Sequence, residues 1–483
     1  MYGYYPQPTK TWLIVKPSLR EKAKQIFLDT DVMITTEGQK HLGAVIGTKQ
    51  FKVKYIEEKI ETWIKEIVTL SKIAKFAPQE AYTCFIRGYK HKLCYSMRTL
   101  PDLKFHLERL DDVITAEFIP SITGGGINVK AEERELFALP TSLGGLGIPI
   151  FHKQCDIEFK NSEMLTNKLC ADIINQVSFD TTPDTNTQRK IKSQITAEKV
   201  KRNNDNQQRL FAEMSIEKRR LCEINSEKGS SIWLTTLPIK EEGYSLDKNT
   251  FWDLLKIRYG KELNHLPEIC ACGAKFNIQH ALSCKNGGFV TLRHNILRDK
   301  TASLLTEVCK DVKIEPQLHT LTGETINTAT NDSEEARLDV SARGFWVPGQ
   351  KAFFDIRVFN PLARRYGNQN LKKAYDNNEK EKKRLYNERV LQCERGSFTP
   401  LVFSTHGGKG RECQKFYQRL ASMVADKRKV DSSIVTKWIN RKLSFALNLA
   451  IIMCIRGSRS LVVGSDNTNS NDAETSETLV QII

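Results

Sequence analysis

The sequence predicts an α+β protein built from several domains. Its 483 residues correspond to roughly three domains of ~150 residues each. In the N-terminal third, apolar residues recur every three or four positions, which is typical of amphipathic helices. Between residues 296 and 430, strand and helix patterns alternate instead. A cluster of cysteines with one histidine lies between these regions, so we expect a helical part, a metal-binding part and an α/β part.

Residues 1–48 are predicted to form short strands. The apolar runs Trp12–Val15 and Asp31–Thr36 predict two of them, and His41–Ile46 predicts a third after a turn at Glu37-Gly38.

Residues 49–150 are predicted to form a small helical domain. Three segments carry apolar residues at helical spacing, and they end in a glycine-rich run at Thr141–Pro149. That run lacks the spacing of a dinucleotide-binding fingerprint, so we interpret it as turn chemistry. The three segments are 51–70, 81–93 and 107–118.

Residues 151–245 are predicted to be a basic linker region. Within it, Arg189–Arg220 holds ten basic residues against four acidic ones. This composition is typical of a solvated helix of mixed charge, and it also suits an arm that contacts phosphates. Both interpretations stay open from the sequence.

Residues 246–295 contain a pattern that predicts a zinc knuckle. Cys270, Cys272, His280 and Cys284 offer three thiolates and one imidazole within fifteen residues. Zinc prefers four such ligands in a tetrahedron, and a site with four protein ligands is structural rather than catalytic. Gly273 follows the second cysteine and suits a tight turn. The alternative is a set of buried free cysteines beside a core histidine.

Residues 296–430 are predicted to form an α/β domain around a mixed sheet, followed by a helical segment at 431–463 and a disordered tail at 464–483. The predicted helices are 296–309, 372–393 and 411–427, and the predicted strands are 312–315, 337–342, 352–358 and 400–404.

Two aspartates in this region predict a magnesium site. Asp339 and Asp355 lie on neighbouring predicted strands, and the fifteen residues between them allow one hairpin. A carboxylate flanked by apolar residues is costly to bury without a partner, and Mg²⁺ is one such partner. Arg357 falls on the same strand face as Asp355 and can offset the charge of a phosphate. The alternative is a pair of buried Asp–Arg salt bridges. Glu307 and Glu315 are candidates for a third carboxylate.

The following helix carries a basic run that includes Lys382, Lys383 and Arg384. Its residues are expected either to form a solvated face or to contact phosphates.

The composition favours a polyanionic partner. Lysines and arginines exceed aspartates and glutamates by 16, a surplus that suits DNA, RNA or a membrane surface. The most apolar run, 443–455, is too short to span a bilayer and is expected to be a buried helix. The start of the chain shows no signal peptide, and its twelve cysteines are scattered. We therefore expect DNA or RNA and no membrane as partner, and a nuclear location.

The order of these motifs resembles the C-terminal half of non-long-terminal-repeat retrotransposon polyproteins with a restriction-endonuclease-like domain. The resemblance rests mainly on Cys270–Cys284 with the following Arg293 and His294, and on the two aspartate strands at 337–361. The segment Tyr5–Trp12 resembles the chain that follows the catalytic hairpin of such reverse transcriptases, and 41–47 resembles their primer-grip hairpin.

The resemblance implies a truncated palm at 1–48, a thumb at 49–150, a zinc knuckle and a restriction-endonuclease-like domain at 296–430. It implies that Asp339 and Asp355 bind Mg²⁺ for nicking DNA, that Lys10 belongs to the closing side of a polymerase site, and that nucleic acid is the partner. We assign contacts with nucleic acid to a set of four basic residues: Lys10, Arg293, Lys382 and Arg384.

No polymerase activity is expected, because the only adjacent aspartate pair, Asp111-Asp112, falls on a predicted helix rather than on a hairpin. Arg357 stands where the family usually has lysine, and arginine does not release its proton at accessible pH. A general base would then come from the helix at 380–383, and Lys383 is our candidate. The chain is accordingly interpreted as a DNA-nicking enzyme, as a module that only binds RNA or DNA, or as a relic of a retroelement.

Overall fold

The computed structural model consists of two compact units. Unit 1 contains residues 1–139 and 147–210, and unit 2 contains 140–146 and 211–483. The structure describes residues 7–125, 129–176, 185–319, 336–367 and 369–459.

The units do not follow the predicted domain boundaries. The boundaries expected after residues 48 and 150 lie inside unit 1, and those expected after residues 295 and 430 lie inside unit 2. The expected disordered tail, 464–483, lies outside the described residues.

Unit 1 begins with two small sheets. Strand β1 (Trp12–Ile14) pairs in parallel with β2 (Met33–Thr35), and helix α1 (Arg20–Ile26) connects them. The segment expected as a third strand is part of a hairpin, β3 (Gly38–His41) and β4 (Ala44–Gly47), because the chain turns at Leu42-Gly43 rather than only before it.

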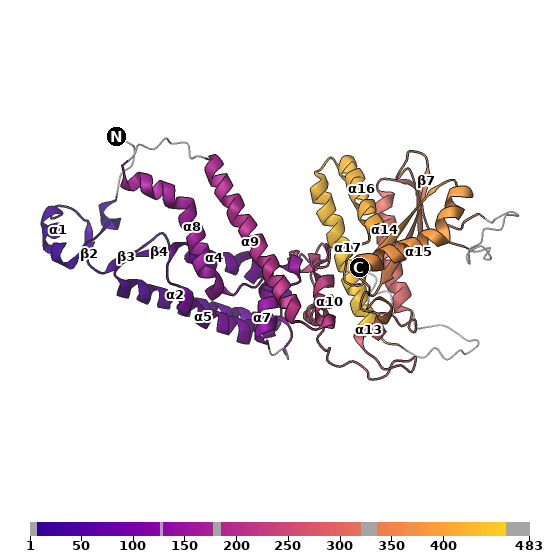
Figure 1. The fold of residues 1–483 in the computed structure, drawn as a ribbon, viewed down its shortest axis with the longest axis horizontal. Coiled ribbons are helices and arrows are strands. Elements are labelled where there is room, and N and C mark those ends of the chain that lie inside the picture. The colour runs from indigo at the N-terminus through magenta and orange to yellow at the C-terminus, as the bar shows by residue number, and fades with distance from the viewer. Residues whose placement is uncertain (1–6, 126–128, 177–184, 320–335, 368, 460–483) are drawn as a thin grey trace. The chain divides into compact units, whose positions relative to one another are not determined.

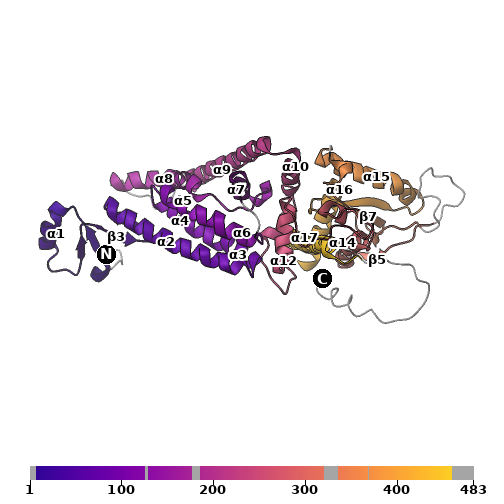
Figure 2. The ribbon, with the colours of Figure 1, turned by 90° about the horizontal axis from the view of Figure 1, so that it is seen from below.

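Helices form the rest of unit 1, and the three helical segments expected at 51–70, 81–93 and 107–118 are confirmed (Figures 1 and 2). The inward side chains of α2, including Trp63 and Ile67, are almost fully buried against α5 and α6. Two π-helical turns, Phe85–Tyr89 and Ile114–Phe118, stack Phe85 on Phe118 with ring centroids 4.8 Å apart. The helices are α2 (Lys49–Ala74), α3 (Pro78–Cys84), α4 (Lys90–Thr99), α5 (Lys104–Val113) and α6 (Ile119–Ile122).

The region predicted as a basic linker, 151–245, is largely helical where the structure describes it. After α7 (Ala131–Ala138), helix α8 (Phe151–Ile174) packs against α4 and α5 and so belongs to the helical unit. The long helix α9 (Thr185–Glu213) carries most of the basic run, and most of its side chains are exposed. An exposed helix fits both interpretations of this run, the solvated helix and the arm that contacts phosphates.

One buried carboxylate joins α5 to the start of α8. The Asp111 carboxylate is 4% exposed and accepts hydrogen bonds from the backbone N–H groups of Phe151 and His152, at 3.0 and 2.9 Å. It therefore caps α8, whose first N–H groups have no partner within the helix. The buried Arg134 guanidinium lies 3.6 Å from the same carboxylate and donates to the carbonyl of Ile148. Asp111, the first residue of the Asp111-Asp112 pair, therefore has a structural role.

Unit 2 is organised around a four-stranded mixed sheet in the order β5-β6-β7-β8. Strand β6 pairs antiparallel with both β5 and β7, whereas β7 and β8 are parallel. This arrangement confirms the mixed sheet expected for residues 296–430. The strands are β5 (Lys310–Ile314), β6 (Val340–Arg343), β7 (Lys351–Phe359) and β8 (Ser397–Ser404).

Helices cover both faces of this sheet (Figures 1 and 2). Helix α15 (Leu371–Gln392) is the crossover between the parallel strands β7 and β8 and lies on one face. Helices α14 (Phe289–Thr306) and α16 (Arg411–Arg428) cover the other face, where Phe354 and Phe416 contact each other. Strand β7 is therefore buried on both sides, which explains its nearly continuous apolar sequence.

The C-terminal helix α17 (Ser432–Arg456) packs against α14 and α16. By length and composition it is apolar enough to cross a membrane, but 56% of its most apolar window is buried within the protein. A core helix of a soluble protein has the same properties, and the expectation of a buried helix is confirmed for these residues.

The knuckle, the sheet and α17 share one hydrophobic core. Cys270 and Cys284 belong to the same cluster of buried side chains as Phe354 of β7 and Leu447 of α17. The described parts of the knuckle, the sheet and α17 therefore pack around one core. The shorter helices of unit 2 are α10 (Ile216–Asn225), α11 (Ile232–Thr235), α12 (Lys248–Arg258) and α13 (Ile278–Ala281).

The Asp111 cap gives a matched pair of variants. We expect Asp111→Ala to destabilise unit 1 by about 3 kcal/mol or more, because it removes the cap and leaves the Arg134 charge buried without its partner. The control Asp112→Ala changes an exposed neighbour on the same helix and is expected to have an effect below about 0.5 kcal/mol. Urea unfolding followed by helical circular dichroism measures both, and equal midpoints for the two variants would contradict the role given to Asp111.

Candidate metal centre and carboxylate site

The predicted zinc ligands come from a tight turn and a short helix. Cys270 and Cys272 lie in a turn that is closed by a bridge between Ile269 and Lys275. Gly273 has φ +83°, a conformation that glycine adopts without a steric penalty, and its N–H donates to the carbonyl of Cys270. The sequence therefore forms a knuckle at the position expected from the spacing.

The other two ligands are placed by helix α13. The Asn277 side chain caps this helix by accepting a hydrogen bond from the His280 N–H at 2.8 Å. The N–H of Cys284 then donates to the carbonyl of His280, so both side chains face the knuckle.

The four ligand atoms of Cys270, Cys272, His280 and Cys284 all lie within 4.8 Å of one another. The Sγ atoms of Cys270 and Cys284 are 3.8 Å apart, and Cys272 Sγ is 3.3 Å from His280 Nε2. The backbone N–H of Cys272 lowers the pKa of Cys270 to about 6 and so favours the thiolate that binds metals. These four residues can hold a metal ion, and the alternative of unrelated buried cysteines does not account for their convergence.

The two predicted aspartates lie beside the last pair of the β6–β7 ladder. Val340 pairs with Phe354, Asp339 directly precedes Val340, and Asp355 directly follows Phe354. The Asp339 carboxylate accepts the N–H of Ile356, and its charge contributes to the raised pKa of Asp355. The β6–β7 hairpin therefore places the two carboxylates near each other.

Asp355 is buried and pairs with Lys382 of α15. It is 5% exposed, and the Lys382 ammonium lies 2.8 Å from its Oδ2 atom. Burial raises the pKa of Asp355 to about 6, while Lys382 opposes this shift and the Asp339 carboxylate adds to it. Burial alone would lower the pKa of Lys382, but Asp355 outweighs burial and raises it. Lys382 also lies 5.5 Å from the ring centroid of Tyr386.

Asp339 is held by a histidine and by the backbone. Its Oδ1 atom is 2.9 Å from Nε2 of His294 on α14, and its Oδ2 atom accepts the N–H of Ile356. The site therefore contains two carboxylates, one ammonium and one imidazole, supplied by β6, β7, α15 and α14.

The other predicted site residues of this region make different contacts. Arg357 pairs with Glu381 of α15 at 3.0 Å, so its charge is already balanced by the chain. Lys383 lies 3.6 Å from Glu412 rather than near the aspartates. Arg384 is exposed on α15. The structure thus brings Lys382, and not Lys383, to the paired carboxylates.

Arg293 requires a correction. We expected it to contact nucleic acid, but it is 2% exposed and donates to the carbonyl of Leu282 at 3.1 Å. Its guanidinium also approaches Cys454 of α17. Arg293 therefore links the knuckle to α17, and a partner in solution does not reach it.

Three further candidates lie away from the carboxylate site. Lys10 is exposed at the end of the short turn Pro8–Lys10 in unit 1. Glu307 is bound by Arg428 and Glu315 by Arg298. Neither glutamate is placed as a third carboxylate beside Asp339 and Asp355.

His294 is the site residue that reasoning from the sequence did not assign a role. The signal for it was weak, because a single histidine on a helix is common. In the part of the chain that the structure describes, the knuckle is the one group of three or more cysteine, histidine or acidic side chains whose ligand atoms converge as a metal site requires. Asp339, Asp355 and His294 lack that convergence.

Comparisons with known proteins do not place the chain in a family. No protein-family model matches the sequence, and no curated protein matches it significantly.

Metal content tests the knuckle directly. We expect the purified chain to hold one equivalent of zinc, and Cys284→Ser to lose it because three ligands bind the ion far more weakly than four. Cys170→Ser, which changes an exposed cysteine on α8, serves as the control and is expected to keep the metal. Atomic absorption gives the stoichiometry. Equal metal in both variants, or none in the unmodified chain, would refute the site.

Proposed function

We propose that unit 2 is a metal-dependent nuclease module that nicks DNA. The observation that carries the proposal is the neighbouring pair Asp339 and Asp355, with Lys382 bound to the second carboxylate. A pair of acidic residues with a nearby lysine suits the hydrolysis of phosphodiesters with the help of a divalent cation.

Each residue has a role that follows from its contacts. Asp339 and Asp355 would hold Mg²⁺, and the burial that raises the pKa of Asp355 is the cost that a bound cation offsets. When bound, Mg²⁺ polarises the scissile phosphate and lowers the pKa of a coordinated water. His294 fixes the orientation of the Asp339 carboxylate through its 2.9 Å contact. Lys382 takes the place of our earlier candidate Lys383 as the basic group beside the reacting phosphate.

In this proposal the knuckle holds a structural zinc ion. Its four protein ligands leave no open coordination position, which is typical of structural rather than catalytic zinc. The knuckle shares one hydrophobic core with β7 and α17, so it stabilises the strand that carries Asp355.

The surplus of 16 positive charges supports a polyanionic partner, DNA or RNA. The resemblance to non-long-terminal-repeat retrotransposon polyproteins favours an origin in such an element and a nuclear location. We propose no polymerase activity for this chain.

A second candidate function is binding of nucleic acid without cleavage. Two ion pairs favour it, because Lys382 already neutralises Asp355 and Glu381 already neutralises Arg357. In such a module these residues would be structural salt bridges, and the basic surface alone would act.

Nicking of supercoiled plasmid in Mg²⁺ or Mn²⁺ separates the two functions. We expect Asp339→Ala to abolish nicking and leave DNA affinity unchanged, because the affinity comes from contacts with phosphates elsewhere. Lys382→Ala is expected to reduce the rate by about 10²-fold or more, because it removes a positive charge that stabilises the reacting phosphate.

The matched control for Lys382→Ala is Lys383→Ala, which removes the same charge from the next position of α15. It is expected to keep most of the nicking rate, since Lys383 pairs with Glu412. A folded protein that binds DNA but does not nick it would favour the binding module instead.

The raised pKa of Asp355 predicts that Mg²⁺ stabilises the protein in a pH-dependent way. Since the folded pKa is about 6 and the unfolded value about 3.8, ionisation of Asp355 costs stability as pH rises from about 4 to above 6. Mg²⁺ binds the ionised carboxylate, so the rise in unfolding temperature on adding Mg²⁺ should be larger at pH 7.5 than at pH 5. Thermal unfolding measures it, and Asp355→Asn should remove the difference. The same Mg²⁺ effect at both pH values would contradict the assignment.

A further inference from the structure

The inward face of α9 in unit 1 has an unusual composition. Residues at positions 199, 202, 206 and 209 recur at helical spacing and lie on the side of α9 that approaches α4, α7 and α8. A helix that packs against a protein normally presents apolar side chains there. Here the face carries Lys199, Arg202, Asn206 and Arg209, and Leu210 is its buried apolar residue.

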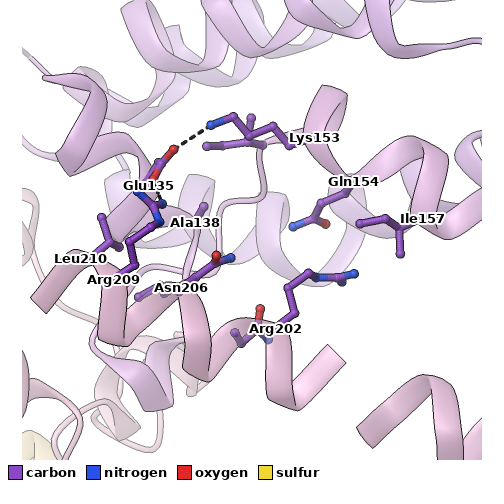
Figure 3. Close-up of a pocket in the computed structure, with 12 residues that line it drawn as sticks. Glu135, Ala138, Lys153, Gln154, Ile157, Arg202, Asn206, Arg209 and Leu210 are labelled. Carbon is purple, nitrogen blue, oxygen red and sulfur yellow. Dashed lines mark hydrogen bonds and ion pairs between the residues drawn. The ribbon is translucent and has the colours of Figure 1, made fainter. Parts of the chain in front are cut away.

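This polar face borders a cavity of about 230 Å³ between α7, α8 and α9. Its floor is apolar and includes Leu139 and Ile157. Figure 3 shows Gln154 of α8 and Arg202 and Asn206 of α9 turned toward one common space. A concave apolar surface with a few convergent polar groups is the usual form of a small-molecule site.

The charges around the cavity are not balanced. Three cationic side chains line it against one carboxylate, Glu135. Lys153 and Arg209 both bind that carboxylate, and their hydrogen bonds lower its pKa although burial opposes the shift. Arg202 is half-buried and forms no ion pair or hydrogen bond with any residue that the structure describes. One guanidinium therefore remains for an anion.

Further positive charge on α9 lies outside the cavity lining. Burial and the like charges of Lys199 and Arg87 lower the pKa of Lys90 of α4, while Cys94 opposes the shift.

The polar side chains that remain are amides. Gln154, Asn203 and Asn206 line the cavity, and none forms a hydrogen bond with a described residue. Each amide offers donors and an acceptor at adjacent positions, which is the pattern needed to bind the edge of a nucleobase. A simple inorganic anion would use none of the acceptors.

We infer that this cavity binds a nucleotide. Its phosphate contacts the Arg202 guanidinium, its base edge contacts the amides of Gln154 and Asn206, and the flat face of the base lies on the apolar floor. The planar fork of arginine matches phosphate oxygens in pairs. The volume of about 230 Å³ leaves room for no more than one nucleotide unit, either a free mononucleotide or one residue of a single strand.

The site lies within unit 1 and uses none of the residues of the proposed nuclease. Its failure and the failure of the nuclease proposal are therefore distinguishable, since Asp339→Ala should leave nucleotide binding unchanged.

Isothermal titration of the full chain without Mg²⁺ tests the inference. The probes are AMP and UMP, inorganic phosphate, and a short single-stranded oligonucleotide. We expect Arg202→Ala to weaken binding of a nucleotide probe at least tenfold, because it removes a charged hydrogen-bond donor. Since Arg202 contacts no described side chain by hydrogen bond or ion pair, this variant should fold normally. Lys201→Ala, an exposed neighbour, is the matched control and should bind like the unmodified chain.

Each outcome of the titrations either supports or overturns the inference. Binding of AMP or UMP that depends on Arg202 supports a site for free nucleotides, and binding of the oligonucleotide alone with the same dependence supports a nucleotide held within a strand. Phosphate that binds as tightly as the nucleotides would overturn the inference. Equal loss in the Arg202 and Lys201 variants, or no binding of any nucleotide probe at about 1 mM, would overturn it as well.

Discussion

A carboxylate in the middle of a buried strand is the constraint on which unit 2 depends. Asp355 lies on β7, between two other strands and beneath α15, where an unpaired charge would be too costly to bury. Lys382 supplies the opposite charge from α15 and so fixes the position of that helix along the sheet. The ion pair between Arg357 and Glu381 also joins β7 to α15, two residues further along the same face of the strand. The face of β7 toward α15 thus combines these ion pairs with the packing of Phe353 and Phe359, whereas its other face packs through Phe354 and Ile356.

The metal knuckle is tied into the same structure. Arg293 donates to the knuckle from α14 and approaches Cys454 of α17, so one buried side chain connects three segments distant in sequence. Burying a guanidinium is costly, and its pKa is lowered accordingly. Burial of Arg293 therefore costs free energy. Its contacts with Leu282 and Cys454 hold the metal ligands against the helices that cover the sheet.

The sequence was sufficient for features set by local periodicity. It predicted the helices at 51–70, 372–393 and 411–427, the strands of the mixed sheet, and the convergence of four metal ligands, because each depends on spacing within a short window. It also predicted the hairpin of β6 and β7 that places Asp339 and Asp355 near each other, because fifteen residues between them allow one tight connection.

Features set by contacts between distant segments were missed. Lys383 was chosen over Lys382, and because successive residues of a helix point about 100° apart, a shift of one position changes the partner completely. Arg293 looked like a surface cation, and only the packing of α17 against α14 shows that it is buried. Residues 151–245 were assigned to a linker, whereas residues 151–174 form α8, whose start is held by Asp111, forty positions before it.

That distant cap has a consequence for how unit 1 folds. Most helices receive their cap from the residue next to them, so they can begin to form locally. Helix α8 receives its cap from α5 only after a loop of 40 residues has closed, and such closure costs conformational entropy before any contact compensates for it. The start of α8 therefore forms together with the tertiary structure, and during synthesis it cannot be completed until α5, α7 and the glycine-rich turn have all assembled.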